Sequence, residues 1–268
     1  MTDPDRRPLP PDVLHDVLHD ALAFPGGLWW RIDVRAETGS TNADAIEAAR
    51  AGEPEGLVIV AERQVAGRGR RDRQWMSPPG AGLTLSVLLR PGVPQNAWSW
   101  LPLLAGVALC EAVGGDASLK WPNDLLIGDG KCAGVLAEAA GDAVVIGIGL
   151  NVTTRADELP PAVGLPAVSL LLAGAPTPDR RALLRSLLGC LSRWYADWRA
   201  TDGDAEACGL ADAYRKRCAT VGRRLTVHLP GGNTLTGDAT TVDGDGQLVI
   251  RTEDGVRLVS AGDVIHVR

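Results

Sequence analysis

The first half of the chain alternates between hydrophobic spacings typical of helices and of strands. Residues 11–23 place leucine and valine at helical spacing ahead of a Pro-Gly-Gly break, which predicts a short amphipathic helix. The apolar segments that follow predict a strand over 31–35, a helix over about 41–51, strands over 57–63 and 83–90, and a buried helix over 97–113. A polar loop over 64–75 separates the two later strands.

The second half predicts strands, then helices, then strands again. Residues 119–152 hold three or four short apolar segments joined by Gly and Asp turns, so antiparallel pairing is expected. Helices are expected over roughly 179–199 and 205–218. The last segment alternates apolar and polar residues between PGGN, DGDG and EDG turns, which predicts about five strands. We therefore expect two domains, 1–218 and 219–268.

The composition is that of an ordinary globular protein, with 45% hydrophobic and 22% charged residues, and excludes wholesale disorder. No uninterrupted apolar run approaches the ~20 residues of a membrane-spanning helix, so no membrane span is expected. The N-terminus, MTDPDRRPLPPD, is charged and proline-rich where a secretory signal would be apolar, which favours the cytoplasm. A net charge of −6 makes the chain a poor polyanion binder, so any basic site must be local.

Neither cysteine nor histidine spacing predicts a metal site. The five cysteines lack CxxC spacing, which supports neither a disulfide framework nor a zinc site. His15 and His19 lie four residues apart without a third ligand nearby, so a solvated helix face is favoured over a metal pair. Only three lysines occur, which makes a lysine inside a motif noticeable.

The polar loop contains GRGRR at 67–71 and a further arginine at Arg73. Glycines let the backbone approach an anion closely, and guanidinium groups bind phosphate or carboxylate through two hydrogen bonds, so this loop is a candidate anion cradle. It lacks the GK[ST] of a Walker loop and the third glycine of a dinucleotide fingerprint. A solvated basic loop or a weak nucleic-acid patch is the alternative interpretation.

Four other short motifs carry candidate chemistry. GSTN at 39–42 places hydroxyls and an amide at a helix start, where they bind a small polar ligand or simply cap the helix. KWPND at 120–124 holds an amide and a carboxylate that suit a nucleotide-bound Mg²⁺ or an Asx turn. GKCAGVLAE at 130–138 puts Lys131 just after a tight turn, facing a ligand or solvent, and the glycines of GIGLN at 147–151 mark a close approach to the strand.

Taken in order, GSTN, QxxGRGRRxRxW, KWPND, GKxxGxLxE and GIGLNV resemble the biotin protein ligase family over roughly residues 37–152. The resemblance implies a mixed, largely antiparallel sheet with helices, related to class II aminoacyl-tRNA synthetase catalytic domains, plus a small C-terminal SH3-like β-barrel. It also implies that the chain activates biotin with ATP as biotinyl-5′-AMP. Biotin then passes to a lysine of a biotin carboxyl carrier domain of an acyl-CoA carboxylase, with Mg²⁺ as the companion of ATP.

The resemblance also implies a role for each motif residue. Arg70 and Lys131 are the expected catalytic residues, because fixed cations suit the charge that develops between carboxyl and phosphate. The residues expected to bind biotin are Ser40, Thr41, Asn42, Gln64, Gly67, Arg68, Gly69, Arg70, Lys131 and Gly134. Those expected on the nucleotide side are Arg70, Arg73, Trp75, Asn123, Asp124, Lys131 and Asn151.

Two features separate this chain from parts of the family. Only 38 residues precede GSTN, too few for a winged DNA-binding domain, so a ligase without repressor function is expected, as a monomer or weak homodimer. Cys132 stands where an aliphatic residue is usual and is interpreted as a packing residue. The alternatives are a lipoate protein ligase, a nucleic-acid-binding protein that uses the arginine loop, and a biotin sensor without ligase activity.

Overall fold

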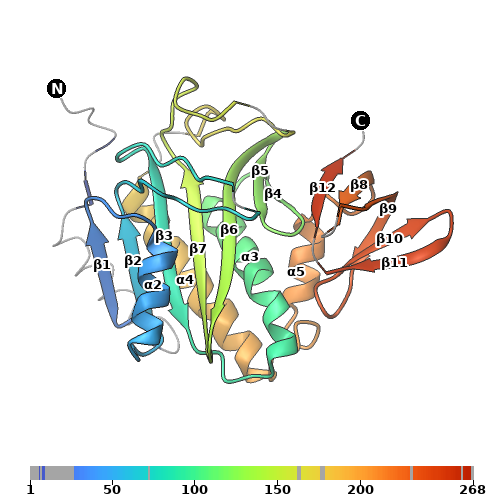
Figure 1. The fold of residues 1–268 in the computed structure, drawn as a ribbon, viewed down its shortest axis with the longest axis horizontal. Coiled ribbons are helices and arrows are strands. Elements are labelled where there is room, and N and C mark those ends of the chain that lie inside the picture. Colours follow the sequence, from blue (N-terminus) through green and yellow to red (C-terminus); the bar gives the residue numbers. More distant parts are fainter. Residues whose placement is uncertain are drawn as a thin grey trace.

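The structure is a computed structural model that describes residues 6, 8–9, 27–71, 73–161, 164–175, 179–229, 232–260 and 262–266. A seven-stranded sheet with helices on both faces forms the larger part, and a five-stranded antiparallel sheet lies beside it at the C-terminal end (Figure 1). The helix predicted over 11–23, with His15 and His19, lies outside the described residues.

The larger sheet has the strand order β1-β2-β3-β7-β6-β5-β4. Only β1 and β2 pair in parallel, and every other neighbouring pair is antiparallel, which confirms the predicted mixed sheet. The four strands from β4 to β7 are consecutive hairpins, as the turns between them predicted. The strands are β1 Arg31–Arg35, β2 Leu57–Ala61, β3 Gly82–Leu89, β4 Ala117–Lys120, β5 Asp124–Ile127, β6 Gly130–Ala140 and β7 Ala143–Asn151.

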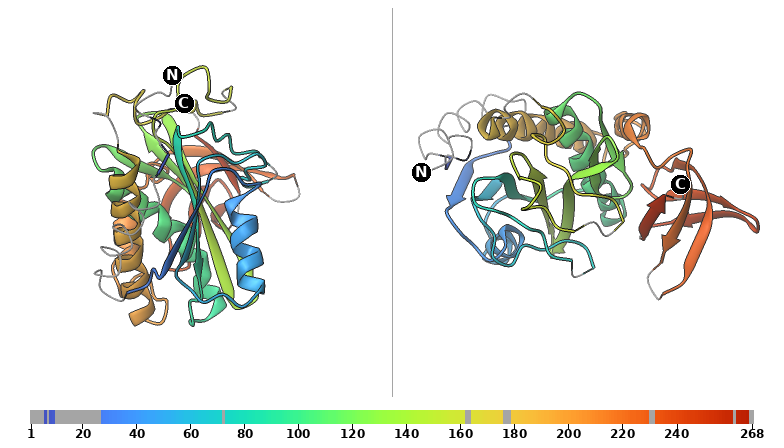
Figure 2. Two further views of the ribbon diagram at one scale, coloured as in Figure 1. Left: turned by 90° about the vertical axis from the view of Figure 1, so that its left-hand side faces the viewer. Right: turned by 90° about the horizontal axis from the view of Figure 1, so that it is seen from above.

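Helices cover the two faces of this sheet unequally. Helix α2 (Thr41–Arg50) lies alone on one face, and α3 (Leu101–Val113) and α4 (Arg180–Ala200) cover the other (Figure 2). The 3-10 helix η2 (Gln95–Trp100) leads into α3. The helix predicted from 205 begins only at Leu210, as α5 (Leu210–Arg217), because Gly209 holds a left-handed backbone (φ 77°) that ends the preceding turns.

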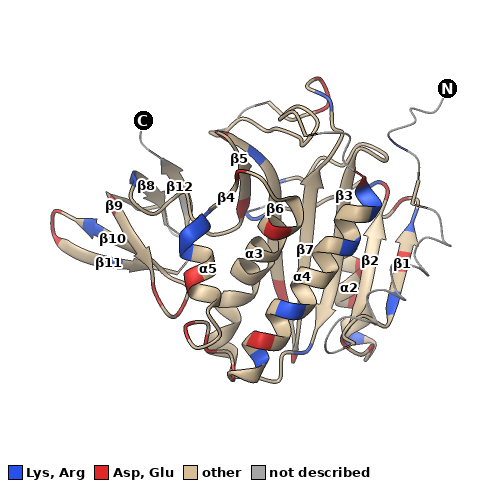
Figure 3. Cartoon of the chain, turned by 180° about the vertical axis from the view of Figure 1, so that it is seen from behind, with Lys and Arg blue, Asp and Glu red and all other residues tan. Residues whose placement is uncertain are grey.

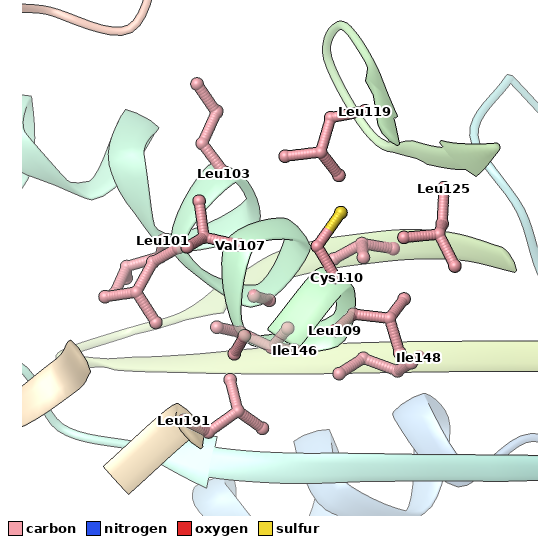
Figure 4. Close-up of a cluster of buried hydrophobic side chains, with 14 of the residues drawn as sticks. Leu101, Leu103, Val107, Leu109, Cys110, Leu119, Leu125, Ile146, Ile148 and Leu191 are labelled. Carbon is pink, nitrogen blue, oxygen red and sulfur yellow. The ribbon is translucent and has the colours of Figure 1, made fainter. Parts of the chain in front are cut away.

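The core lies between the sheet and α3 and α4. Side chains along α3 pack against alternate residues of β7, and Figure 4 shows Leu101, Leu103, Val107, Leu109 and Cys110 beside Ile146, Ile148 and Leu191. The stretch Gln95–Val113 is long and apolar enough to cross a membrane by length and composition alone. Nine of the thirteen residues of α3 are buried here against the sheet and α4, as in the central helix of a globular core.

The C-terminal sheet has the order β11-β10-β9-β8-β12 and matches the five predicted strands. They are β8 Arg224–His228, β9 Thr234–Val242, β10 Leu248–Thr252, β11 Gly255–Val259 and β12 Asp263–His266. Side chains of the larger part bind three successive backbone carbonyls of its 243–247 turn. Trp100 Nε1 donates to Gly244 O (2.6 Å), Ser99 Oγ to Asp245 O (2.8 Å) and Trp121 Nε1 to Gly246 O (3.0 Å). The boundary near Ala219 remains a prediction.

Candidate active site

A cavity of about 390 Å³ opens on the sheet face that carries α2. The segment between β2 and β3 crosses this face in front of β7 and β6 (Figure 1). All but one of the predicted site residues line the cavity, namely Ser40, Thr41, Asn42, Gln64, Arg68, Gly69, Arg70, Arg73, Trp75, Asn123, Asp124, Lys131, Gly134 and Asn151. The fifteenth, Gly67, is adjacent, and a Cβ on it would lie 2.8 Å from Gln64 Nε2.

The start of α2 forms one end of the cavity. Ser40 is the N-cap by position, with an extended backbone, but its side chain makes no capping hydrogen bond. Gln64 caps the helix instead, because its Oε1 accepts from Thr41 N (2.8 Å) and lies 3.1 Å from Thr41 Oγ1. Simple capping by Ser40 or Thr41 therefore does not explain GSTN, and its hydroxyls and amide stand in the cavity wall.

The arginine loop is a small irregular hairpin. Gly69 N donates to Arg73 O (2.7 Å), Trp75 N donates to Gly67 O (2.9 Å), and Arg68 and Gln74 form an isolated bridge. Gly67 and Gly69 face these partners so closely that a side chain on Gly67 would meet Trp75 O at 2.5 Å. Guanidinium groups of this hairpin point in different directions, with Arg68 bound to Glu138 on β6, Arg70 to Asn123 and Arg71 to His228 O on β8. Its role as an anion cradle stays a prediction.

Cationic side chains gather at the other end of the cavity. Lys131 Nζ lies 2.7 Å from Asp124 Oδ1, and Arg70 Nη1 donates to Asn123 Oδ1 (3.3 Å). The turn after β4 and the start of β6 supply these groups, since β4, β5 and β6 are consecutive hairpin strands. The KWPND and GKCAGVLAE motifs therefore meet in space with the arginine loop.

Glycines on β7 form the floor of the cavity. A Cβ on Gly147 would lie 2.0 Å from Asn42 Oδ1, and one on Gly149 would lie 2.3 Å from Trp75 Cε2. Because side chains alternate across a strand, Ile146 and Ile148 face the core while the two glycines admit Asn42 and the indole. The close approach predicted for GIGLN is thus made by the protein's own side chains.

Two residues near the floor differ in character. Asn151, at the end of β7, is buried and donates from Nδ2 to Val168 O (3.1 Å). Cys132 is fully buried behind it, and this burial raises the pKa of the thiol to about 12. Because the thiol stays protonated, Cys132 is a packing residue and not a nucleophile, which is consistent with the sequence interpretation.

Sequence reasoning gave no role to four polar residues at or beside the cavity. Lys120 lines it and is only 7% exposed, and Thr84 also lines it. Ser86 and Glu138 contact residues that line it. One signal was available for the hydroxyls, because Thr84 and Ser86 are the only polar side chains of the apolar strand LTLSVLL and share one face.

The described residues do not form a metal centre by themselves, as no group of three or more His, Cys, Asp or Glu is placed to hold an ion. All five cysteines are free. Hydroxyl and amide groups at one end of the cavity and cations at the other suit a ligand with a polar head and an anionic tail next to phosphate. Such an arrangement is suited to a ligase that activates a carboxylic acid.

Comparison with known proteins specifies this class. Residues 38–151 match the "Biotin/lipoate A/B protein ligase family" and residues 220–267 the "Biotin protein ligase C terminal domain". The "Biotin--[acetyl-CoA-carboxylase] ligase" of Mycobacterium tuberculosis is 42% identical over all of both chains. The "Bifunctional ligase/repressor BirA" of Bacillus subtilis is 34% identical over 84% of this chain and 70% of its own. A biotin protein ligase from Aquifex aeolicus, solved with biotin and ATP, superposes with a TM-score of 0.77 at 28% identity, covering 90% of this chain and 100% of its own.

The chain therefore belongs to the biotin protein ligase family. This finding confirms the predicted family, fold class and enzyme class. The individual roles of the site residues stay predictions.

Proposed function

We propose that this protein activates biotin with ATP and attaches it to a lysine of a biotin carboxyl carrier domain. The observation that carries the proposal is the single cavity in which the GSTN hydroxyls, the arginine loop and Lys131 meet. Biotin and ATP are bound in the Aquifex aeolicus structure, and the M. tuberculosis relative is named for acetyl-CoA carboxylase. We infer an acceptor domain of acetyl-CoA carboxylase or a related carboxylase.

In the first step a biotin carboxylate oxygen attacks the α-phosphorus of ATP, and pyrophosphate leaves with the electron pair of the broken P–O bond. Both reactants are anions, so the step needs fixed positive charge between them. Lys131 and Arg70 stand at the cationic end of the cavity and are proposed to bind the carboxyl and α-phosphate oxygens. Arg73, Trp75 and Asn151 are proposed to border the nucleotide.

In the second step the lysine ε-amine of the carrier attacks the acyl carbon of biotinyl-5′-AMP. An amide bond forms, the acyl–phosphate bond breaks, AMP leaves, and the amine gives up a proton. The hydroxyl and amide groups of Ser40, Thr41, Asn42 and Gln64 are proposed to hold the ureido ring during both steps. The loop over 65–75 is proposed to close over the adenylate and exclude water.

Magnesium is the expected companion of ATP. A Mg²⁺ held mainly by phosphates needs only one or two protein oxygens, and the Asp124 carboxylate with the Asn123 amide oxygen fits that requirement. The ion would offset phosphate charge. We propose a cytoplasmic enzyme, monomeric or weakly dimeric. No DNA binding is proposed, in keeping with the net charge of −6 and with the mixture of acidic and basic residues along α4 and α5 (Figure 3).

The deciding experiment is intact-mass analysis of a carrier domain incubated with this protein, ATP, Mg²⁺ and either biotin or lipoate. A single biotin-sized increase that requires ATP and is absent with lipoate is the expected result. An increase with lipoate would assign the protein to lipoate ligation. No increase with either, together with no biotin-dependent pyrophosphate release, would favour a biotin sensor.

A further inference from the structure

Glu138 belongs to the GKxxGxLxE motif but has no role in the function proposed above. It lies on β6, whose cavity-side face the arginine loop crosses (Figure 1), and its side chain is 21% exposed. Glu138 is not among the described residues that line the cavity, so it does not contact a ligand there directly. Its carboxylate nevertheless contacts two residues that do line the cavity.

The two carboxylate oxygens of Glu138 accept hydrogen bonds from two different segments. Oε1 accepts from Arg68 Nη2 on the arginine loop (2.6 Å), and Oε2 accepts from Asn42 Nδ2 on α2 (2.8 Å). The side chain of Glu138 thus contacts Arg68, 70 positions earlier in the sequence, and Asn42, 96 positions earlier. A carboxylate that accepts from both a guanidinium and an amide is suited to fix their relative positions.

The contacts continue beyond Asn42 and return to the same loop. Asn42 Oδ1 accepts from the fully buried Ser86 hydroxyl (2.6 Å), and Ser86 Oγ lies 2.7 Å from Thr41 Oγ1. Thr41 Oγ1 in turn lies 3.1 Å from the oxygen of Gln64, where the loop begins. A chain of polar contacts therefore runs from Gln64 through α2 and β3 to Glu138 and Arg68, and the main chain of the loop connects its two ends.

Every other connection in this chain of contacts involves at least one neutral group, including the hydrogen bond from Asn42 to Glu138. The Arg68–Glu138 contact is the only step in it that joins two charged groups, and Arg68 is the more exposed partner at 52%. A half-exposed ion pair contributes little to the stability of a fold. Its location, where the loop passes over the sheet, makes it effective in holding the loop against the cavity.

We propose that Glu138 is a positioning residue that holds the arginine loop closed over the bound adenylate. This inference rests on the proposed function and deepens it. Glu138 acts through Arg68 and Asn42 and does not touch the reacting atoms. Its removal lets the loop open more often, so biotinyl-5′-AMP escapes before transfer, while the groups that form it stay in place.

The test compares Glu138→Gln with the wild type and with a matched control, Glu37→Gln. Glutamine keeps the volume and an oxygen for Asn42 but removes the charge that binds Arg68. Glu37 pairs with Arg63 (2.9 Å) just before the same loop, at an exposed site where neither residue lines the cavity, so its loss controls for removing an arginine–glutamate pair. Equal thermal unfolding midpoints establish that each variant is folded.

Each protein is loaded with biotin, ATP and Mg²⁺, separated from free ligand, and mixed with serum albumin, which has no carrier domain. The rate of albumin biotinylation reports released adenylate. We expect release from E138Q to be about fivefold faster than from wild type, the upper range for a partly exposed ion pair. Single-turnover pyrophosphate formation at saturating biotin should stay within about twofold. E37Q should match wild type in both.

A double-mutant cycle with Arg68→Gln separates this role from general loosening. If the pair acts as one contact, the double variant releases adenylate no faster than the faster single variant. Additive effects, a wild-type release rate in E138Q, or equally fast release in E37Q would each overturn the inference. Failure of the wild type to form adenylate at all would instead overturn the proposed function, and this inference with it.

Discussion

Lysine is scarce in this chain, and two of its three lysines line the same cavity. Lys120 and Lys131 stand there, whereas Lys216 lies exposed on α5. Lys131 is half-buried beside Asp124, at the end of the cavity where Arg70 also points. A compact ammonium in such a place supplies a fixed positive charge that an arginine, with its planar fork, would place differently.

Lys131→Ala should chiefly impair adenylation. Removing one fixed charge donor from such a site typically lowers the rate by ~100-fold or more, because the developing phosphate charge loses its partner. Biotin-dependent pyrophosphate release measures this step, with Lys216→Ala as the control that removes a lysine outside the cavity. An unchanged rate in K131A would show that Lys131 has no role in adenylation.

The motif residues at this scale were predictable because each motif is continuous in sequence. Glu138 and Ser86 were not assigned because their partners lie 44 or more positions away, and only strand register brings them together. The register also shifts between Leu125 and Leu126 at a bulge in the β5–β6 pair, which no periodic pattern indicates.

Among the elements, β7 combines two surfaces in one strand. Alternate isoleucines build the core and alternate glycines build the cavity floor, so the strand is fully buried on both faces. Its hydrophobic pattern predicted a strand, and the short turn before it predicted pairing with β6, but nothing predicted pairing with β3. Apolar runs specify a strand, whereas the placement of β7 beside β3 depends on contacts between residues distant in the sequence, from the pair Leu89 and Val144 to the pair Gly82 and Asn151.

Gly147→Ala should weaken biotin binding and destabilise the fold. The added methyl would lie 2.0 Å from Asn42 Oδ1, and Asn42 is held by contacts to Ser86 and Glu138 that resist its displacement. Overpacking of this kind costs about 1–3 kcal/mol. Denaturant unfolding and calorimetric biotin titration measure the two effects.

The control for this substitution is Gly244→Ala, where the nearest atom outside the glycine's chain neighbours would be 3.8 Å from the new methyl. Its unfolding free energy should change by only a few tenths of a kcal/mol. Wild-type biotin affinity and stability in G147A would contradict the close approach seen here.

At the scale of the whole molecule, Arg6 and Leu9 bind segments that are distant in the sequence. Arg6 donates to the Glu158 carboxylate (2.7 Å) and to Thr153 O (2.9 Å), and Leu9 N donates to Glu62 Oε1 (2.7 Å). Glu158 belongs to the segment after β7 that also supplies Pro160 to the cavity lining. Arg6 therefore binds the segment after β7 from 147 and 152 positions away, and Leu9 binds Glu62 from 53 positions away.

The Arg6–Glu158 contact predicts a defined acid response. The hydrogen bond from Arg6 lowers the pKa of Glu158 to about 2 from its ordinary 4.5. A depressed folded-state pKa adds stability above pH 4.5, and this contribution disappears as the pH falls toward 2. Arg6→Ala should cost about 1–2 kcal/mol at pH 7, and the gap from wild type should narrow as the pH falls from 4.5 toward 2.

Urea unfolding at several pH values measures this gap. Arg63→Ala is the control, because Arg63 and Glu37 form a largely exposed pair whose loss should change little at any pH. A difference between R6A and wild type that is the same at pH 7 and pH 3 would contradict the assignment.

The two-sheet organisation was foreseen from hydrophobic patterning together with the turns, but the way the sheets meet was not. Turn residues are local, whereas the contact uses Trp100 and Trp121, which sequence patterns assign only to an apolar helix and a proline turn. Tryptophans of this kind cannot be matched to carbonyl partners more than a hundred positions away without the fold.

The contact between the two sheets uses backbone atoms of the 243–247 turn, because three successive carbonyls of this turn accept the hydrogen bonds. The identity of a side chain such as Asp245 therefore matters little to the attachment. The number of residues in the turn matters greatly, because one insertion would move all three acceptors out of reach together. Among related sequences we therefore expect substitutions within the 243–247 turn to be common and insertions or deletions in it to be rare.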